Sequence, residues 1–170
     1  MIERASLRGL IIRHLTNRTV AGENVFDTWP TMISKHDIPA VNVRTPHERA
    51  SNGGYAGSRN VFHVEQTVMI DCLVAAKSNW SNKIDALCGQ VEQIAVLGLP
   101  IAESAYTVTS VETTISVDEE KAVPIAMATI QIVYSYIEQK EVDDGLSPLQ
   151  GTTFKDTNTG GGVTASADMP

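Results

Sequence analysis

Few residues in this 170-residue chain combine a type and a spacing that could support chemistry. Two of the four histidines precede an acid, in His36-Asp37 and His47-Glu48. Neighbours in sequence do not provide the converging side chains that a metal site or an acid–base pair needs. His14 falls at the edge of an apolar helical stripe, where a half-buried structural histidine is the simpler interpretation. We therefore assign none of these residues to catalysis.

The remaining candidates are also separated from one another. His63 and Asp71 lie on the polar side of one expected strand, about 26 Å apart by the strand rise. Cys72 lies on the apolar side of that strand and Cys88 beside an apolar helical stripe, so both are interpreted as small core residues. The Gly-rich stretch 53–58 lacks the Lys-Ser/Thr pair of a phosphate-binding loop. We expect no catalytic, cofactor-binding or metal-binding residue, and no enzyme.

The composition is typical of a globular domain, with 42% hydrophobic residues. No apolar run approaches the roughly 18 residues needed to cross a bilayer, and no signal-peptide core follows Met1. Two cysteines cannot build a disulfide framework or a four-thiolate zinc site. The chain is therefore expected to work in a reducing interior, without a membrane.

Charge is distributed unevenly along the chain, whose net charge is −7. Residues 1–60 hold eight basic and five acidic residues, and they include every arginine, whereas residues 61–170 hold five basic and fifteen acidic residues. A solvated surface is the simplest interpretation. The alternative is that a basic surface and an acidic surface meet on neighbouring copies of the chain, since complementary charge steers association. An acidic chain argues against sequence-specific DNA binding.

The first half of the chain predicts one helix and several strands. Residues 2–16 place apolar side chains at three- and four-residue spacing, which indicates an amphipathic helix. Val25-Phe26 is expected to be a short edge strand. A strand from Ile38 to Thr45 is expected to stop at Pro46, and residues 46–60 to form a polar, Gly-rich loop. The alternation in 61–75 predicts a strand so long that it either bends or projects beyond its domain.

The second half predicts a helix and a hairpin. Residues 79–97 carry a single apolar stripe, with Ser78 as the expected cap and Gly98 as a left-handed end. Residues 106–118 form an expected strand whose apolar parity changes, which suggests a bulge. The last strand is expected from Ile125 to Ile137, antiparallel to the one before it.

These elements predict an α+β fold with a mixed, mainly antiparallel sheet of four to five strands and two helices packed on one face. That domain is expected to cover residues 1–138. Residues 139–170 are polar, hold five of the twelve glycines, and are expected to form an extended C-terminal arm, ordered only against a neighbour.

The order of several local strings resembles the phage tail terminator family, the lambda tail protein U-like proteins, with their related tail-completion and neck proteins. The resemblance covers roughly residues 1–137. It is carried by Thr19 to Gly22 with Val25-Phe26-Asp27, by Ile38 to Val43 with the exit Thr45 to Arg49, by Ile84 to Glu92, by Val111-Glu112-Thr113, and by Tyr134-Ser135-Tyr136.

This resemblance implies a structural virion protein that caps the head-proximal end of the tail tube as a ring. It would end tail polymerisation and provide the joint to the head connector. The implied partners are other copies in a hexameric ring, the tail tube protein and the connector or neck protein, and the tail sheath stays open as a further one. DNA would pass through the ring without specific binding. The implied location is the virion tail, assembled in the host cytoplasm.

Two alternatives stay open. One is a neck or head–tail completion protein of similar fold. The other is a small ligand-binding α+β domain, which would need a deep pocket with convergent polar groups that include His63, Asp71 or Cys72.

Overall fold

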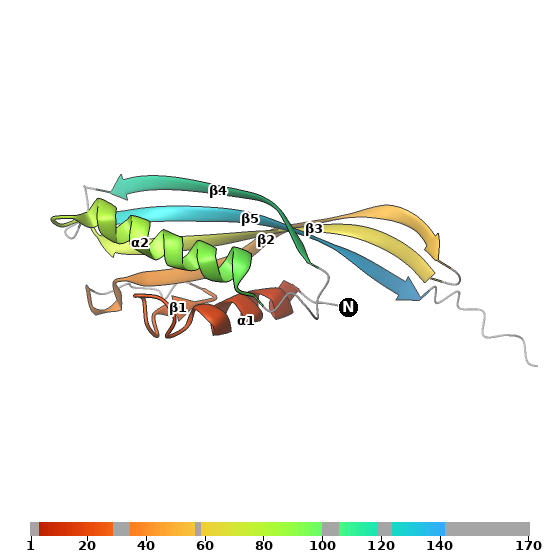
Figure 1. Cartoon of the computed structure of the whole chain (residues 1–170), viewed down its shortest axis with the longest axis horizontal. Helices are drawn as coiled ribbons and strands as arrows, with labels where there is room; N and C mark the ends of the chain where they lie inside the picture. The colour runs from red at the N-terminus through yellow and green to blue at the C-terminus, as the bar shows by residue number, and fades with distance from the viewer. Residues whose placement is uncertain (1–3, 29–34, 57–58, 100–105, 119–123, 142–170) are drawn as a thin grey trace, which may run out of the picture.

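The computed structural model describes residues 4–28, 35–56, 59–99, 106–118 and 124–141, and Figure 1 shows their arrangement. These residues form α1 (Arg4–Leu15), β1 (Val25–Phe26), the short 3-10 turn η1 (Lys35–Asp37), β2 (Ala40–Ala56), β3 (Arg59–Ala75), α2 (Trp80–Glu92), the π-helical turn η2 (Gln93–Leu97), β4 (Thr107–Asp118) and β5 (Ile125–Glu141).

The five strands form one mixed sheet in the order β1-β2-β3-β5-β4. β1 pairs parallel to β2, and the other neighbouring strands pair antiparallel. Both α-helices pack on one face of this sheet, which we call the inner face, and the opposite face is called the outer face (Figure 1). The expected α+β class, with a mixed sheet and two helices on one face, is confirmed.

The core lies on the inner face because apolar residues alternate along the central strands. On β3, Val64, Val68, Ile70, Cys72 and Val74 are buried toward the helices, as the alternation predicts. The side chains that pack against them include Ala126, Ala128, Ile130, Ile132 and Tyr134 from β5, and Leu7, Ile11, Leu15, Ile84, Leu87 and Val91 from the two helices. Burial of this apolar area holds the helices to the sheet.

Both ends of the second helix differ from the sequence prediction. The N-cap residue is Asn79, at φ 61°, and it makes no side-chain capping bond, so the expected Ser78 cap is wrong. Gly98 has φ −106°, so the expected left-handed end is also wrong. A Cβ at Gly98 would lie 3.2 Å from the Gln93 carbonyl oxygen, which leaves little room for a larger residue after the π-helical turn.

Strand β2 contradicts the sequence prediction most clearly. Neither the expected stop at Pro46 nor the expected loop over residues 46–60 is correct, because β2 continues to Ala56 and pairs with β3 throughout. The register shifts between Arg44 and His47, so Pro46 lies in a β-bulge, where a residue without an N–H is tolerated. Pairing with β3, a strand of the same chain, orders this polar segment.

Three strands run past both helices and form what we call the projecting ribbon (Figure 1). It comprises residues 51–56 of β2, 59–63 of β3 and 137–141 of β5. None of its described side chains is buried. It extends beyond β4 because β4 begins at Thr107, opposite Ser135. At about 3.3 Å per residue, five residues give a projection of about 17 Å.

The last two strands form the expected antiparallel hairpin. The expected bulge in β4 is a register shift between Val108 and Ser110. β5 continues to Glu141, past the expected strand end at Ile137 and past residue 138, where the expected domain ends. Residues 142–170, the rest of the expected C-terminal arm, lie outside the described residues.

Tyr134→Phe tests a single buried hydrogen bond in this core. The Tyr134 hydroxyl donates to the Ala95 carbonyl at 2.8 Å and so joins β5 to the π-helical turn. We expect a loss of about 1–2 kcal/mol in unfolding free energy, measured by urea denaturation, because the buried carbonyl loses its partner. Tyr106→Phe is the matched control, since the Tyr106 hydroxyl is buried without a partner among the described residues. An equal loss in both variants would contradict the assignment.

Stability is expected to fall at alkaline pH. Burial, with smaller contributions from Tyr136 and Glu48, raises the pKa of Tyr106 to about 12. A tyrosine in the unfolded chain ionises near pH 10. Between about pH 10 and 12 the unfolded chain therefore binds fewer protons than the folded chain, and stability decreases as pH rises. Tyr106→Phe should flatten this slope in urea titrations. An unchanged slope would show that the Tyr106 hydroxyl does not contribute.

Candidate functional site

The structure brings neither histidine–acid neighbour pair into a converging site. His47 and Glu48 are successive residues after the bulge in β2, so they point to opposite faces of the sheet. His36 and Asp37 lie in the short turn η1, on the chain before β2. His14 is half-buried on α1, as expected of a structural histidine.

His63 and Asp71 are far apart, as the strand rise predicts. His63 lies in the projecting ribbon and pairs with Ser51 and Ile137, whereas Asp71 lies within the domain and pairs with Thr129. Cys72, next to Asp71, points to the inner face and is buried in the core. No pocket that the structure describes combines these three candidates.

A polar hollow of about 380 Å³ does contain His63, at the base of the projecting ribbon on the outer face. Arg49, Ser51, Glu65 and Ser135 line it with His63, and all but Ser135 are exposed. The Ser51 hydroxyl donates to the His63 backbone carbonyl, not to the imidazole. Such an open, solvated set of side chains suits contact with a partner better than the activation of a nucleophile.

The two cysteines pack together inside the core. Cys72 and Cys88 are both buried and free, and they join β3 to α2. Contact with the Cys88 thiol, together with burial, raises the pKa of the Cys72 thiol. The Cys72 thiol therefore stays protonated at neutral pH, and a protonated buried thiol is a poor nucleophile. The same contact lowers the pKa of the Cys88 thiol, but both residues lie in the core cluster, as the sequence predicts.

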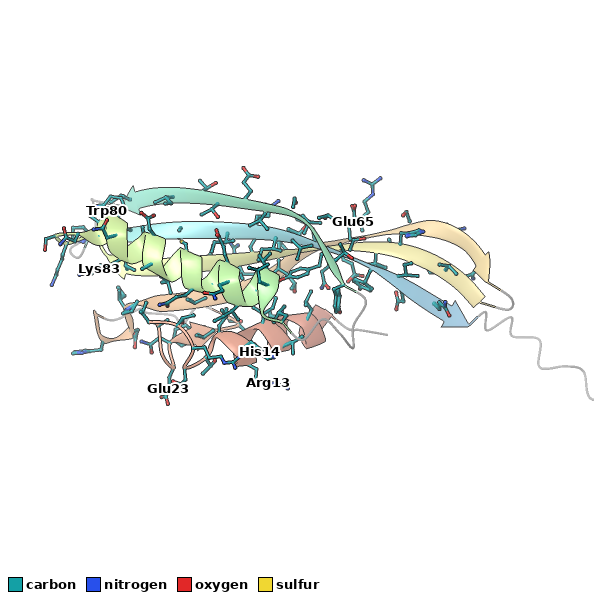
Figure 2. The ribbon with its side chains drawn as sticks, viewed as in Figure 1. Arg13, His14, Glu23, Glu65, Trp80 and Lys83 are labelled. Carbon is teal, nitrogen blue, oxygen red and sulfur yellow. The ribbon has the colours of Figure 1, made fainter. Side chains whose placement is uncertain are left out.

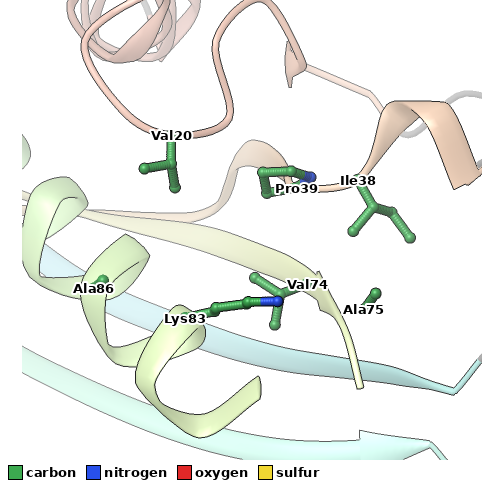
Figure 3. Close-up of a pocket in the computed structure, with 7 residues that line it drawn as sticks. All are labelled: Val20, Ile38, Pro39, Val74, Ala75, Lys83 and Ala86. Carbon is green, nitrogen blue, oxygen red and sulfur yellow. The ribbon is translucent and has the colours of Figure 1, made fainter. Parts of the chain in front are cut away.

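An apolar hollow of about 300 Å³ lies between the loop after α1 and the start of α2 (Figure 3). Its described lining residues are Val20, Ile38, Pro39, Val74, Ala75, Lys83 and Ala86. Lys83 is the only charged side chain among them. This hollow lacks the several convergent polar groups that fix a small ligand in a specific site.

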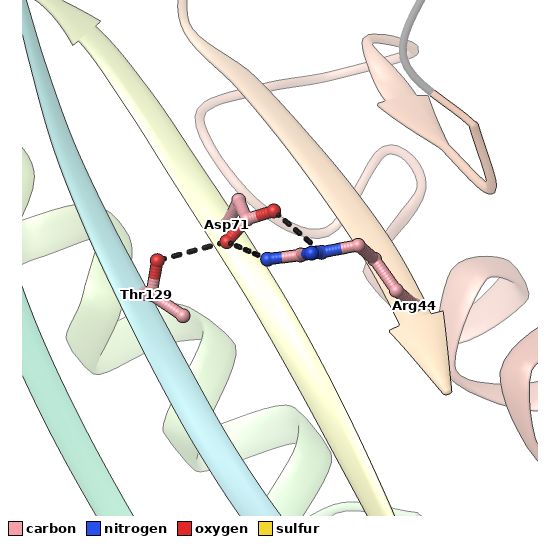
Figure 4. Close-up of polar contacts among 3 residues, drawn as sticks. All are labelled: Arg44, Asp71 and Thr129. Atoms are coloured by element: carbon pink, nitrogen blue, oxygen red, sulfur yellow. Dashed lines mark hydrogen bonds and ion pairs between the residues drawn. The ribbon is translucent and has the colours of Figure 1, made fainter. Parts of the chain in front are cut away.

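The strongest polar network lies on the outer face, where the bulge begins (Figure 4). Asp71 is buried, and its carboxylate accepts from Arg44 Nε at 2.9 Å, from Arg44 Nη2 at 3.1 Å and from the Thr129 hydroxyl at 2.8 Å. The three residues belong to β2, β3 and β5, so the network ties three strands together. Its role is structural, because the bonds of Arg44 and Thr129 to the Asp71 carboxylate hold neighbouring strands together.

Among the residues that the structure describes, no cluster of three or more histidine, cysteine or acidic side chains could hold a metal ion. Within the same residues, no helix is both long enough and apolar enough to pass through a membrane.

Comparison with known proteins gives no further identification. The chain matches no protein-family model, and it has no significant similarity to a curated protein.

Sequence reasoning missed the role of Arg44 and Thr129. The sequence suggests only His63 and Cys72, on the same strand, as companions of Asp71, whereas its actual partners lie on the two neighbouring strands. The one signal in the sequence is Asp71 itself, an acidic residue on a predicted strand whose opposite side is apolar. Naming its partner needs the pairing register of β2 and β5.

Arg44→Ala should destabilise the fold by about 1–2 kcal/mol in urea denaturation. The buried Asp71 carboxylate would keep only the Thr129 hydroxyl as a partner, which is costly. Solvent screening limits the effect, since the Arg44 side chain is 48% exposed. Arg49→Ala, two register positions past the bulge, removes an exposed arginine and should change stability by less than about 0.5 kcal/mol. Similar values for both variants would argue against the network.

Proposed function

We propose that this protein is a structural ring subunit that caps the head-proximal end of a phage tail tube. In this role it ends tube polymerisation and joins the tail to the head connector. The order of the sequence motifs over residues 1–137 supports this family, and the α+β fold is compatible with it. The protein then works by assembly and catalyses no reaction.

The projecting ribbon is the observation that carries the proposal. Its three paired strands leave the helix-covered domain, and none of their described side chains is buried. Phe62 packs against the core, but no described side chain of the ribbon is buried, so the ribbon contributes little to the stability of the isolated chain and contact with other chains is its best explanation. Ile137, which is 56% exposed on the ribbon, offers an apolar contact point. The polar hollow around His63 lies directly at its base.

The partners follow from this role. Copies of the chain form the ring, hexameric in the family that it resembles, and the ring contacts the tail tube on one side and the connector or neck protein on the other. The tail sheath remains a further candidate. The acidic chain, with a net charge of −7, would leave passing DNA unbound by repulsion. The protein would be located in the virion tail after assembly in the host cytoplasm.

Particles assembled without this protein test the proposal directly. A missing terminator leaves tube polymerisation unchecked, so we expect tubes longer than those of complete particles in negative-stain electron microscopy. Tails of normal length that fail to join heads would instead identify a neck or completion protein. Adding the purified chain back should restore both length and joining. Particles that are normal without the chain would refute both roles.

A further inference from the structure

Neither of the two α-helices that the structure describes covers the inner face of β4. α1 packs over β2, and α2 packs over β3 and β5. Val111, Ile115 and Val117 of β4 point to the inner face, since each pairs with a buried residue of β5. They are nevertheless 42%, 45% and 37% exposed. A row of three exposed β-branched side chains on the core-facing side of a strand indicates a surface that another element covers.

This row borders a hollow of about 370 Å³ between α2 and β4, which we call the α2–β4 groove. Its lining residues are Gly89, Glu92, Gln93, Val96, Leu97 and Val111. Leu97 is 80% exposed, the highest value among the described large apolar side chains. Glu92 links the two walls by accepting a hydrogen bond from the Thr113 hydroxyl at 2.9 Å. The groove is therefore a mainly apolar surface with one acid, Glu92, in its lining.

The two lateral edges of the sheet carry opposite charge. Asp85 precedes Glu92 by two helical turns on the same flank of α2, and the β4 sequence holds two acids and no basic residue. The α1 sequence holds three arginines and no acid. Figure 2 places Arg13 at the edge of the molecule opposite β4, although the acidic Glu23 lies near it. One lateral side of the chain is thus mainly basic and the other acidic.

Each of these two sides carries a glycine inside a helix. Gly9 of α1 and Gly89 of α2 have open space where a Cβ would project, so none of the described residues requires them to be small. Glycine in a helix interior costs roughly 0.5–1 kcal/mol relative to alanine. Close approach of another chain at both helices explains why each position lacks a side chain.

We propose that the α2–β4 groove receives the arginine-bearing side of α1 from a second copy of this chain. Charge selects this occupant over residues 142–170, which hold four acids and one lysine and would be repelled by Glu92 and Asp85. The two surfaces lie toward opposite edges of the sheet, on the same face, so each contact leaves one groove and one helix free. Such a head-to-tail contact builds a ring when the rotation between neighbouring copies closes, and an open filament when it does not. The inference rests on the proposed function and names the surfaces that build the ring.

Two charge-reversal variants test this contact. Asp85→Lys with Glu92→Lys alters only the groove, and Arg13→Glu with Arg18→Glu alters only the helix side. Asp85, Arg13 and Arg18 are exposed and Glu92 is half-buried, so both variants should fold. In analytical ultracentrifugation each variant alone should self-associate at least tenfold more weakly than the wild-type chain. An equimolar mixture should form larger assemblies again, because every groove in the mixture then meets a helix of opposite charge on the other variant.

Combining all four reversals should restore the wild-type assembly, since the charges again complement each other. Lys77→Glu, a charge reversal at an exposed residue in the loop before α2, is the control and should leave assembly unchanged. Wild-type rings that tolerate both reversals would overturn this interface but leave the proposed function standing. A wild-type chain that stays monomeric and also fails to bind tail tube ends would overturn both.

Gly89→Gln provides a test that does not depend on charge. Glutamine favours a helix more than glycine does, so the thermal midpoint of the chain should stay the same or rise. The longer side chain would fill the groove, and we expect self-association to weaken at least tenfold. Wild-type assembly by this variant would show that α1 of the second copy does not enter the groove at Gly89.

Discussion

Two short helices cannot cover a sheet of five long strands, and most surface features of this molecule depend on that mismatch. A helix is about 10 Å wide and neighbouring strands lie about 4.8 Å apart, so each helix covers two strands. α1 has 12 residues and α2 has 13, giving lengths of about 18 and 20 Å, whereas a 17-residue strand extends about 56 Å. The uncovered remainder is β4 along one edge and the projecting ribbon at one end.

Strand order determines where these open surfaces lie relative to charge. The arginine-rich N-terminal part supplies α1, β1 and β2, which occupy one side of the sheet, and the acidic part supplies α2, β4 and β5. The asymmetry along the sequence therefore becomes an asymmetry across the sheet. The ribbon runs along the strands, perpendicular to that direction, so lateral contacts and end contacts use different parts of the molecule. In the proposed ring, this separation would leave the ribbon free for contacts outside the ring.

Much of the fold was predictable, because alternation on β3 and the apolar stripes of both helices are local signals that agree with the packed core. β2 was not, since Pro46 and the glycines after it are strong local signals for a loop. Pairing with β3 overrides them, and the bulge absorbs the proline. For the same reason the network of Arg44, Asp71 and Thr129 could not be found, because its members meet only across three strands. The uncovered inner face of β4 likewise depends on where the helices lie, which no single segment of sequence determines.

An interface built from a small apolar groove and a few charges has a useful consequence for a capping protein. Such a contact is weak in isolation, and screening by salt weakens its charged part further. Copies held side by side at the end of a tube experience a much higher effective concentration, so the same contact becomes strong there. Lateral closure would then happen where the tube presents its subunits, and free chains would not polymerise into filaments. On this view, the incomplete cover of the sheet by helices exposes the lateral surfaces. It also keeps the contact between them small, so that free chains do not assemble away from the tube.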